Sequence, residues 1–215
     1  MAIGTDEDAR FDYVVVGAGT AGCLLADRLS ATGASVCVLE AGGRDWSPLI
    51  HLPVGYVWNV HSRRLTWDYA VEPGPVVNRR FRLPQGKVLG GSSSINGLSH
   101  VRGQRQDYDD WAAVGNPGWS YLEILPYFMR SERKVGVGDD RFRGRSGSLH
   151  ITDQDWSHPI CDAFVNGLSE LGIPLTDDYN GMVHTGGGYL QRAIHNGRRC
   201  SSARAFLKPA MQRPN

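Results

Sequence analysis

The sequence predicts an α/β fold whose first strands are parallel. A short β-branched run, residues 11–16, leads directly into the glycine-rich stretch 17–22. An Ala- and Leu-rich segment with apolar residues at helical spacing follows, and a second β-branched run covers residues 36–39. A strand, a helix and a strand over so short a span predict two parallel neighbours joined by a right-handed crossover, the start of a Rossmann-like domain.

The composition is typical of an ordinary globular chain. Of the 215 residues, 41% are hydrophobic and 21% are charged, which suits one large domain or two small ones. The 23 lysines and arginines nearly cancel the 22 acidic residues, so no bulk attraction to nucleic acid or to an anionic membrane is indicated. We therefore expect small-molecule or protein partners and no nucleic acid.

The cysteines and the N-terminus favour a cytoplasmic protein. Cys23, Cys37, Cys161 and Cys200 lie far apart without a CxxC pair, which predicts free thiols and no metal site. The first residues are acidic, unlike the basic start of a signal peptide. No apolar stretch approaches the roughly 20 residues that cross a bilayer, so we expect no membrane span.

The middle of the chain changes character twice. Residues 42–84 are aromatic and punctuated by prolines without a sustained period, so we expect a long excursion with short elements. Residues 107–114 look helical. Ser120 and Glu123 then have the spacing of a capping box, which predicts a helix that starts at Tyr121.

The last third predicts a loop and two helices. Residues 134–147 are charged and glycine-rich, which is typical of an exposed loop. Pro159 near a helix start and Gly172 as its stop bound an amphipathic helix. A last short helix should begin after residues 201–202 and end before Pro209.

The glycine-rich stretch after the first strand fits a dinucleotide fingerprint, GxGxxG. Gly17 would make the tight turn, Gly19 would let the backbone approach a pyrophosphate, and Gly22 would allow close packing of helix on strand. Phosphates would lie at the helix N-terminus, where free N–H groups and the helix dipole favour an anion.

Glu40 ends the second strand, 21 residues after Gly19, where an acidic side chain accepts hydrogen bonds from an adenosine ribose. It also argues against NADP, whose 2′-phosphate it would repel. The alternative is a purely structural turn with Glu40 as a solvated strand end, and the fingerprint by itself does not separate NAD from FAD.

A second glycine cluster covers residues 86–96 and combines a flexible backbone with small hydroxyl side chains and one amide. Such a segment can pass close to a flat ring system and offer donors to it. The alternative interpretation is a flexible serine-rich loop.

Here the chain resembles glucose–methanol–choline (GMC) oxidoreductases. Their first signature has a basic residue, an apolar residue, Gly-Gly, two small residues, an apolar residue and Asn, with Gly and Asp following. The matching residues are Lys87, Leu89, Gly90, Gly91, Ser92, Ser93, Ile95, Asn96, Gly103 and Asp109. His100 departs from the pattern, which usually has an aromatic residue or alanine there. Further segments resemble the choline dehydrogenase-like bacterial branch: 11–30, 39–43, 67–69, 102–103, 107–108, 116–119, 179–181 and 199–210.

The resemblance implies an FAD-binding, Rossmann-like domain of the glutathione-reductase type, together with the start of an α+β substrate domain. Residues 1–150 would be the N-terminal part of the FAD-binding domain, and residues 151–198 would begin the substrate domain. Residues 199–215 would return toward the FAD domain. Both domains would be incomplete within this chain.

The resemblance also implies where FAD binds. The pyrophosphate residues would be Gly17, Gly19, Thr20, Ala21 and Gly22, with Glu40 at the adenosine ribose and Ala41 and Trp67 along the adenine side. Val88, Gly90, Gly91 and Ser92 would line the ribityl chain, and Asn96, Gly97, Leu98 and Ser99 the isoalloxazine. In the choline oxidase branch a histidine immediately before the asparagine bonds covalently to the flavin. Ile95 stands there in this chain, so we expect non-covalent FAD.

The implied reaction is oxidation of a small-molecule alcohol to an aldehyde by hydride transfer to flavin N5. In the family, a histidine accepts the alcohol proton, and it belongs to a motif far toward the C-terminus. The seven histidines of this chain stand singly, so we assign no catalytic residue here. Two alternatives remain open: a flavin-containing lyase of the same fold, such as a hydroxynitrile lyase, and a non-catalytic FAD-binding fragment.

Two parallel strands and a crossover cannot close a doubly wound sheet. Unpaired edges and uncovered apolar faces are therefore expected. The chain could be a fragment, a truncated gene product, or one polypeptide of a split or nicked enzyme whose other chain supplies the C-terminal half. We favour the last.

Overall fold

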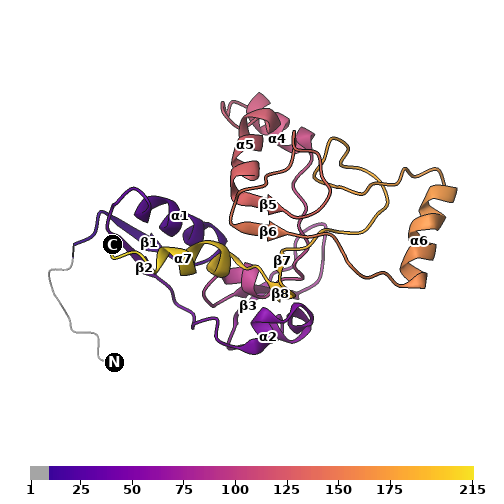
Figure 1. The fold of residues 1–215 in the computed structure, drawn as a ribbon. Coiled ribbons are helices and arrows are strands. Elements are labelled where there is room, and N and C mark those ends of the chain that lie inside the picture. Colours follow the sequence, from indigo (N-terminus) through magenta and orange to yellow (C-terminus); the bar gives the residue numbers. More distant parts are fainter. Residues whose placement is uncertain (1–9) are drawn as a thin grey trace. The chain divides into compact units, whose positions relative to one another are not determined.

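The structure of the chain is a computed structural model that describes residues 10–215 (Figure 1). By its internal contacts the chain divides into two compact units. Unit 1 comprises Met1–Asn96 with Ser201–Asn215, and unit 2 comprises Gly97–Cys200. The acidic start of the chain lies outside the described residues. Residues 97–150 belong to unit 2 by their contacts. The predicted domains were defined by their roles in binding cofactor and substrate, so their bounds stay a prediction.

Unit 1 opens on the predicted strand, helix and strand. β1 (Tyr13–Val16) and β2 (Val36–Leu39) pair in parallel with Tyr13 opposite Val36, and α1 (Thr20–Ser30) connects them. The βαβ unit expected from the apolar pattern is therefore confirmed.

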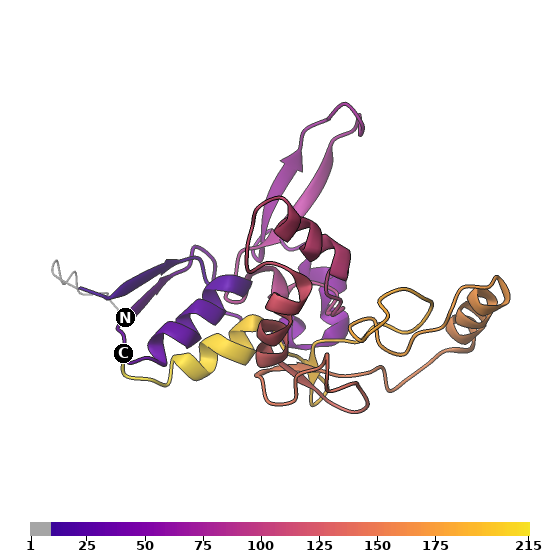
Figure 2. The same ribbon diagram turned by 90° about the horizontal axis from the view of Figure 1, so that it is seen from above.

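The C-terminal residues of unit 1 pack against α1 (Figure 2). A π-helical segment, Ala203–Leu207, continues into α7 (Lys208–Ala210). The predicted start after residues 201–202 is confirmed, but the predicted end before Pro209 is wrong. Pro209 lies within the continuous run from Ala203 to Ala210, directly after the π-helical segment, so the proline does not stop the helix.

The excursion of unit 1 contains short elements, as predicted. The helical ones are α2 (Pro48–His51), a 3₁₀ turn (Pro53–Gly55) and α3 (Tyr56–Asn59). They are followed by an antiparallel hairpin of β3 (Thr66–Val71) and β4 (Phe81–Gly86), whose two strands Figure 2 shows side by side. A 3₁₀ turn, Gly91–Ser94, then carries the second glycine cluster.

Unit 2 combines helices with short strand pairs. Its helices are α4 (Arg105–Ala113), α5 (Tyr121–Ser131) and α6 (Pro159–Glu170). Its strands are β5 (Glu132–Lys134) with β6 (Leu149–Ile151), in parallel, and β7 (Ile194–His195) with β8 (Arg198–Arg199), antiparallel. α5 starts at Tyr121 behind the predicted capping box, in which the Glu123 carboxylate accepts a hydrogen bond from the Ser120 backbone N–H at 3.1 Å.

The exposed loop predicted over residues 134–147 is wrong in part. Lys134, Phe142 and Arg143 are buried, and Lys134 belongs to β5. The charges of Lys134 and Arg143 do not face water because they are paired inside unit 2, whereas the other charged side chains of the segment are at least partly exposed. The Arg143 guanidinium, for example, donates to the Glu132 carboxylate at 2.8 and 3.0 Å.

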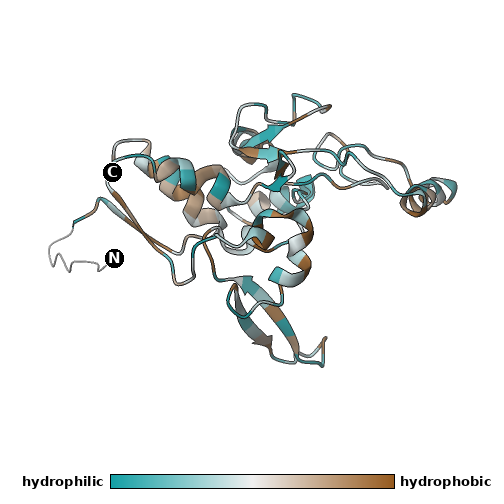
Figure 3. Ribbon diagram, turned by 60° about the horizontal axis from the view of Figure 1, so that its bottom comes forward, coloured by the Kyte–Doolittle hydropathy of each residue, from teal (hydrophilic) through white to brown (hydrophobic). Residues whose placement is uncertain are grey.

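The two-stranded sheet of unit 1 leaves apolar side chains uncovered, as predicted. Val15 is buried, whereas Val14 and Val16 on the opposite face are 55% and 83% exposed and Leu39 is 52% exposed. In Figure 3, β1 and β2 carry hydrophobic residues, coloured brown. Within residues 10–215, no helix has the length and apolar character needed to cross a membrane. The four cysteines are free thiols.

Candidate dinucleotide site

The turn between β1 and α1 has the geometry that its glycines predict. Gly17 has φ +93°, which favours glycine, and its N–H donates to the Leu39 carbonyl at 2.7 Å. A Cβ at Gly22 would collide with the Gly17 carbonyl oxygen and lie 3.3 Å from Val15. Close packing of helix on strand therefore requires glycine at position 22.

Gly19 lies at the N-terminus of α1 and faces open space. A Cβ built there meets no heavy atom within 4 Å, and no side chain caps the helix start. The first helical residues, Thr20 and Ala21, are exposed. This is the arrangement that an anion requires, because uncapped N–H groups and the positive end of the helix dipole meet in an accessible place.

Glu40 holds two backbone segments together. Its Oε2 accepts a hydrogen bond from the Ala18 N–H at 2.7 Å, and its Oε1 accepts one from the Gly42 N–H at 2.7 Å. The side chain thus ties the end of β2 to the glycine turn. A carboxylate can accept further hydrogen bonds, so the predicted ribose contact is compatible with these two and stays a prediction.

The two glycine clusters lie against each other. The Gly90 N–H donates to the Ala18 carbonyl at 2.7 Å. A Cβ at Gly91 would lie 2.8 Å from the Gly19 Cα, and both Gly90 and Gly91 have positive φ. The structure therefore brings together two groups of predicted site residues, about seventy positions apart in the sequence, on one side of the glycine turn.

The serines of the second cluster support its own backbone. The Ser93 hydroxyl donates to the Gly90 carbonyl at 2.6 Å, and the Ser94 hydroxyl donates to the Leu89 carbonyl at 2.7 Å. Ser92 accepts from the Gly86 N–H at 3.0 Å. The serines therefore fix the turn, and the expectation that the segment offers donors to a flat ring stays a prediction.

Beneath this turn, Val88 and Ile95 pack with Ile50 in a fully buried apolar cluster. The side chain at the position of the covalent histidine in the choline oxidase branch therefore lies in the core of unit 1. Asn96, which follows it, is exposed.

The two remaining predicted residues of unit 1 are Ala41 and Trp67. Ala41 is exposed just after β2. Trp67 lies in β3, where the Lys87 ammonium stands 4.1 Å from the ring centroid and Tyr69 stacks at 6.3 Å. Sequence reasoning overlooked Gly42, where a Cβ would collide with the backbone of Lys87 and Val88. The glycine of the LEAGG stretch is the signal that could have found it.

Gly97, Leu98 and Ser99 belong to unit 2. Leu98 is buried and has φ +64°, a left-handed conformation that non-glycine residues rarely adopt. Its carbonyl accepts a hydrogen bond from the Ala193 N–H at 2.9 Å.

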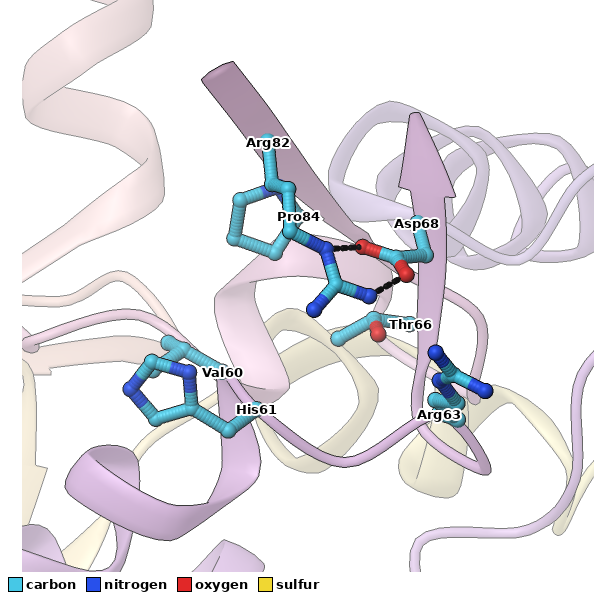
Figure 4. Close-up of a pocket in the computed structure, with 7 residues that line it drawn as sticks. All are labelled: Val60, His61, Arg63, Thr66, Asp68, Arg82 and Pro84. Atoms are coloured by element: carbon cyan, nitrogen blue, oxygen red, sulfur yellow. Dashed lines mark hydrogen bonds and ion pairs between the residues drawn. The ribbon is translucent and has the colours of Figure 1, made fainter. Parts of the chain in front are cut away.

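A pocket of about 140 Å³ lies in unit 1 between the segment 60–66 and the hairpin (Figure 4). Its lining residues are Val60, His61, Arg63, Thr66, Asp68, Arg82 and Pro84. Arg82 is committed to an ion pair with Asp68, with Nε and Oδ1 2.7 Å apart. The pocket was not predicted because its residues come from segments without a recognisable pattern.

Cys23 in α1 is a buried thiol close to the glycine turn. It donates to the Ala18 carbonyl at 3.2 Å, and burial raises the pKa of its thiol to about 11. A thiol with so high a pKa is almost entirely protonated at neutral pH, which makes it a poor nucleophile.

A parallel βαβ unit with this glycine turn and an acidic residue after the second strand defines a dinucleotide-binding α/β protein. Residues 11–215 match the GMC oxidoreductase family, and the chain belongs to that family. The comparisons with solved structures include an FAD-dependent oxidoreductase, which supports FAD as the dinucleotide.

Curated relatives and solved structures agree on this family. The chain is 45% identical over 206 residues to an oxygen-dependent choline dehydrogenase of Rhizobium etli (strain CIAT 652), and 46% identical to one of Sinorhizobium fredii. Each comparison covers 95% of this chain and 37% of the relative. The chain therefore spans little more than a third of the length of these relatives.

Among solved structures, pyridoxine 4-oxidase from Mesorbium loti is 32% identical, with a TM-score of 0.89 over 95% of this chain and 41% of that one. An FAD-dependent oxidoreductase from Chaetomium thermophilum is 29% identical, with a TM-score of 0.85 over 95% of this chain and 37% of that one.

Proposed function

We propose that this chain forms the FAD-binding part of an oxidoreductase that oxidises a small alcohol to an aldehyde. The observation that carries the proposal is the close approach of the two glycine clusters, in which Gly91 lies against Gly19 at the uncapped start of α1. A single glycine turn would suit NAD or FAD alike. A second cluster next to it offers a path for the ribityl chain, which only a flavin dinucleotide has.

FAD would be held along this path by the residues already described. The first turn of α1 would bind the pyrophosphate, and Glu40, held by the Ala18 and Gly42 N–H groups, would accept hydrogen bonds from the adenosine ribose. Val88, Gly90, Gly91 and Ser92 follow the ribityl chain, and residues 96–99 face the isoalloxazine. When bound, the flavin supplies the hydride acceptor, N5.

The flavin is held without a covalent bond. Ile95 supports this because its side chain packs with Ile50 and Val88, and an aliphatic side chain forms no bond to a flavin. Denaturing and precipitating the holoprotein should leave the yellow colour in the supernatant. Colour that stays with the precipitated protein would refute non-covalent binding.

We assign no residue of this chain as the group that accepts the alcohol proton. An imidazole suits the task because its pKa lies close to neutral pH. The curated relatives carry their remaining length in the same protein as the matched region. That a second polypeptide supplies the C-terminal half stays a prediction. Cytoplasmic location also stays a prediction. The intact mass of every polypeptide in a purified, active sample tests whether a second polypeptide is present.

The redox activity is tested on the complete enzyme without oxygen. The names of the relatives suggest choline and pyridoxine as the first alcohols to try. We expect the flavin absorbance to bleach with at least one alcohol, since hydride transfer reduces the ring. A flavoprotein that bleaches with no alcohol would instead support a lyase of the same fold or a non-catalytic FAD-binding protein.

A further inference from the structure

Unit 2 contains a buried carboxylate, Glu132, that is 1% exposed and has five donors. Arg143 donates to it through Nε at 2.8 Å and Nη2 at 3.0 Å, and Arg102 through Nη2 at 3.1 Å. The Gly144 N–H lies at 3.1 Å and the His100 Nε2 at 3.2 Å. A single side chain thus connects the segments around residues 100, 132 and 143.

The pKa of Glu132 reflects this environment. Burial raises it, but the hydrogen bonds from His100 and Arg143 and the charges of Arg102 and Arg143 outweigh burial and lower it to about 2. The carboxylate is therefore ionised at neutral pH, and both guanidinium groups have an anionic partner inside unit 2.

The network reaches further through Arg143. Its Nη1 lies 2.5 Å from Asp178 Oδ1 and 2.5 Å from Gln191 Oε1. Gln191 Oε1 also accepts from the Asn180 amide at 3.3 Å. Glu132 thereby orients, through Arg143, the side chains of two further segments.

These segments hold residues 98–102 on both sides. The Asn180 side chain accepts from the Arg102 N–H at 2.7 Å and donates to the His100 carbonyl at 2.9 Å. The His100 N–H donates to the Gln191 carbonyl at 2.9 Å. The backbone from 98 to 102 is therefore fixed by contacts with residues far away in the sequence.

The backbone conformation of Leu98 requires the hydrogen bonds that hold residues 98–102. Its φ of +64° is unfavourable for a residue with a Cβ, and such conformations persist only where the surroundings impose them. Strained, over-determined backbone gathers at ligand-binding segments, and this segment is the one that the family resemblance assigns to the isoalloxazine.

We propose that Glu132 is a positioning residue for the flavin. By holding His100 and Arg102 it fixes the backbone conformation of Leu98 and Ser99, which would face the isoalloxazine. The inference rests on the proposed function, since it assumes that FAD is the ligand. Glu132 is buried and its carboxylate is taken up by these donors, so it would act on the flavin through them.

The test compares FAD with ADP in the complete enzyme. ADP carries only the adenosine and pyrophosphate part, which the proposed function assigns to unit 1. Glu132→Gln removes the charge, and His100→Ala removes one donor while both arginines keep their anionic partner. Asp140→Asn is the matched control because its carboxylate is exposed and forms, within residues 10–215, an ion pair with Arg145 and not with Glu132's partners.

Flavin fluorescence on dilution of the holoenzyme gives the FAD dissociation constant, and competition gives the constant for ADP. We expect FAD to bind ~10-fold more weakly in both network variants, ~1.4 kcal/mol, with ADP binding unchanged. Hydrogen exchange of the amides in 98–102 should accelerate in both. Asp140→Asn should match the wild type in all three measurements.

Unchanged FAD binding in folded His100→Ala and Glu132→Gln would overturn the inference, and so would an equal loss of ADP binding, which indicates general destabilisation. If Glu132→Gln does not fold, His100→Ala decides between these outcomes. Failure of the proposed function looks different, because the wild type itself would then bind no FAD.

Discussion

The carbonyl oxygen of Ala18 accepts a hydrogen bond from the Gly90 N–H at 2.7 Å. This bond joins the glycine turn after β1 to the second glycine cluster. It leaves Gly91 so close to Gly19 that a Cβ would stand 2.8 Å from the Gly19 Cα.

Gly91→Ala should disrupt the junction. The added methyl group meets the Gly19 backbone, and φ +54° is strained for alanine, so we expect a loss of about 1–3 kcal/mol in the free energy of unfolding. The ratio of flavin to protein absorbance in the purified enzyme should fall. Gly74→Ala is the control, because a Cβ at Gly74 meets nothing within 4 Å. Equal flavin content in the two variants would contradict the prediction.

Glu40→Gln should weaken the adenosine part of the site. The amide keeps one acceptor oxygen but places an NH₂ group against the Ala18 or the Gly42 N–H, at a cost of about 1–2 kcal/mol. Calorimetric titration should show FAD and ADP weakened alike, in contrast with the effect expected at Glu132. Unchanged ADP binding would show that Glu40 serves only to hold the backbone of the glycine turn.

Stability should depend on pH through Glu132. Its pKa in the fold is about 2, below its ordinary value of 4.5, so its contribution is complete above pH 4.5 and lost as the pH falls toward 2. The difference corresponds to about 3 kcal/mol. Denaturant unfolding across this window should show a steeper decline for the wild type than for Glu132→Gln. Parallel curves would contradict the prediction.

Cys23 should resist alkylation in the folded protein. Its thiol is buried in α1 and its pKa is raised to about 11, whereas the Cys161 side chain is exposed. Mass spectrometry after treatment with iodoacetamide at neutral pH should find Cys161 modified first. After unfolding, both should react. Rapid modification of Cys23 in the native state would show that α1 opens readily.

The local features of unit 1 could be predicted because each is encoded within a few residues. Each strand is indicated by its own β-branched run, which ends at Val16 or Leu39, and the turn is indicated by the glycines from Gly17 onward. The start of α5 was predicted for the same reason, since a capping box requires only Ser120 and Glu123. The predicted helix end before Pro209 was wrong because a proline does not by itself end a helix, and the helical run continues to Ala210.

The interior of unit 2 could not be predicted because its partners are distant. The sequence around Arg143 predicts an exposed loop residue. In the structure Arg143 pairs with Glu132 and Asp178, and Asp178 is 35 positions away. The hydrogen bonds of the serine cluster could not be predicted either. The sequence shows the hydroxyl groups but not that Ser93 donates to the Gly90 carbonyl. Long-range pairing decides which polar residues are available to a ligand.

The central claim, that the two glycine clusters form an FAD site, is tested most directly by titrating flavin-free enzyme with FAD, NAD and NADP in a calorimeter. The account predicts saturable binding of one FAD per chain, displaced by ADP, with NAD binding no more tightly than ADP and NADP binding more weakly because Glu40 repels its 2′-phosphate. Tight binding of NAD at the same site, or no binding of FAD to the folded enzyme, would contradict it.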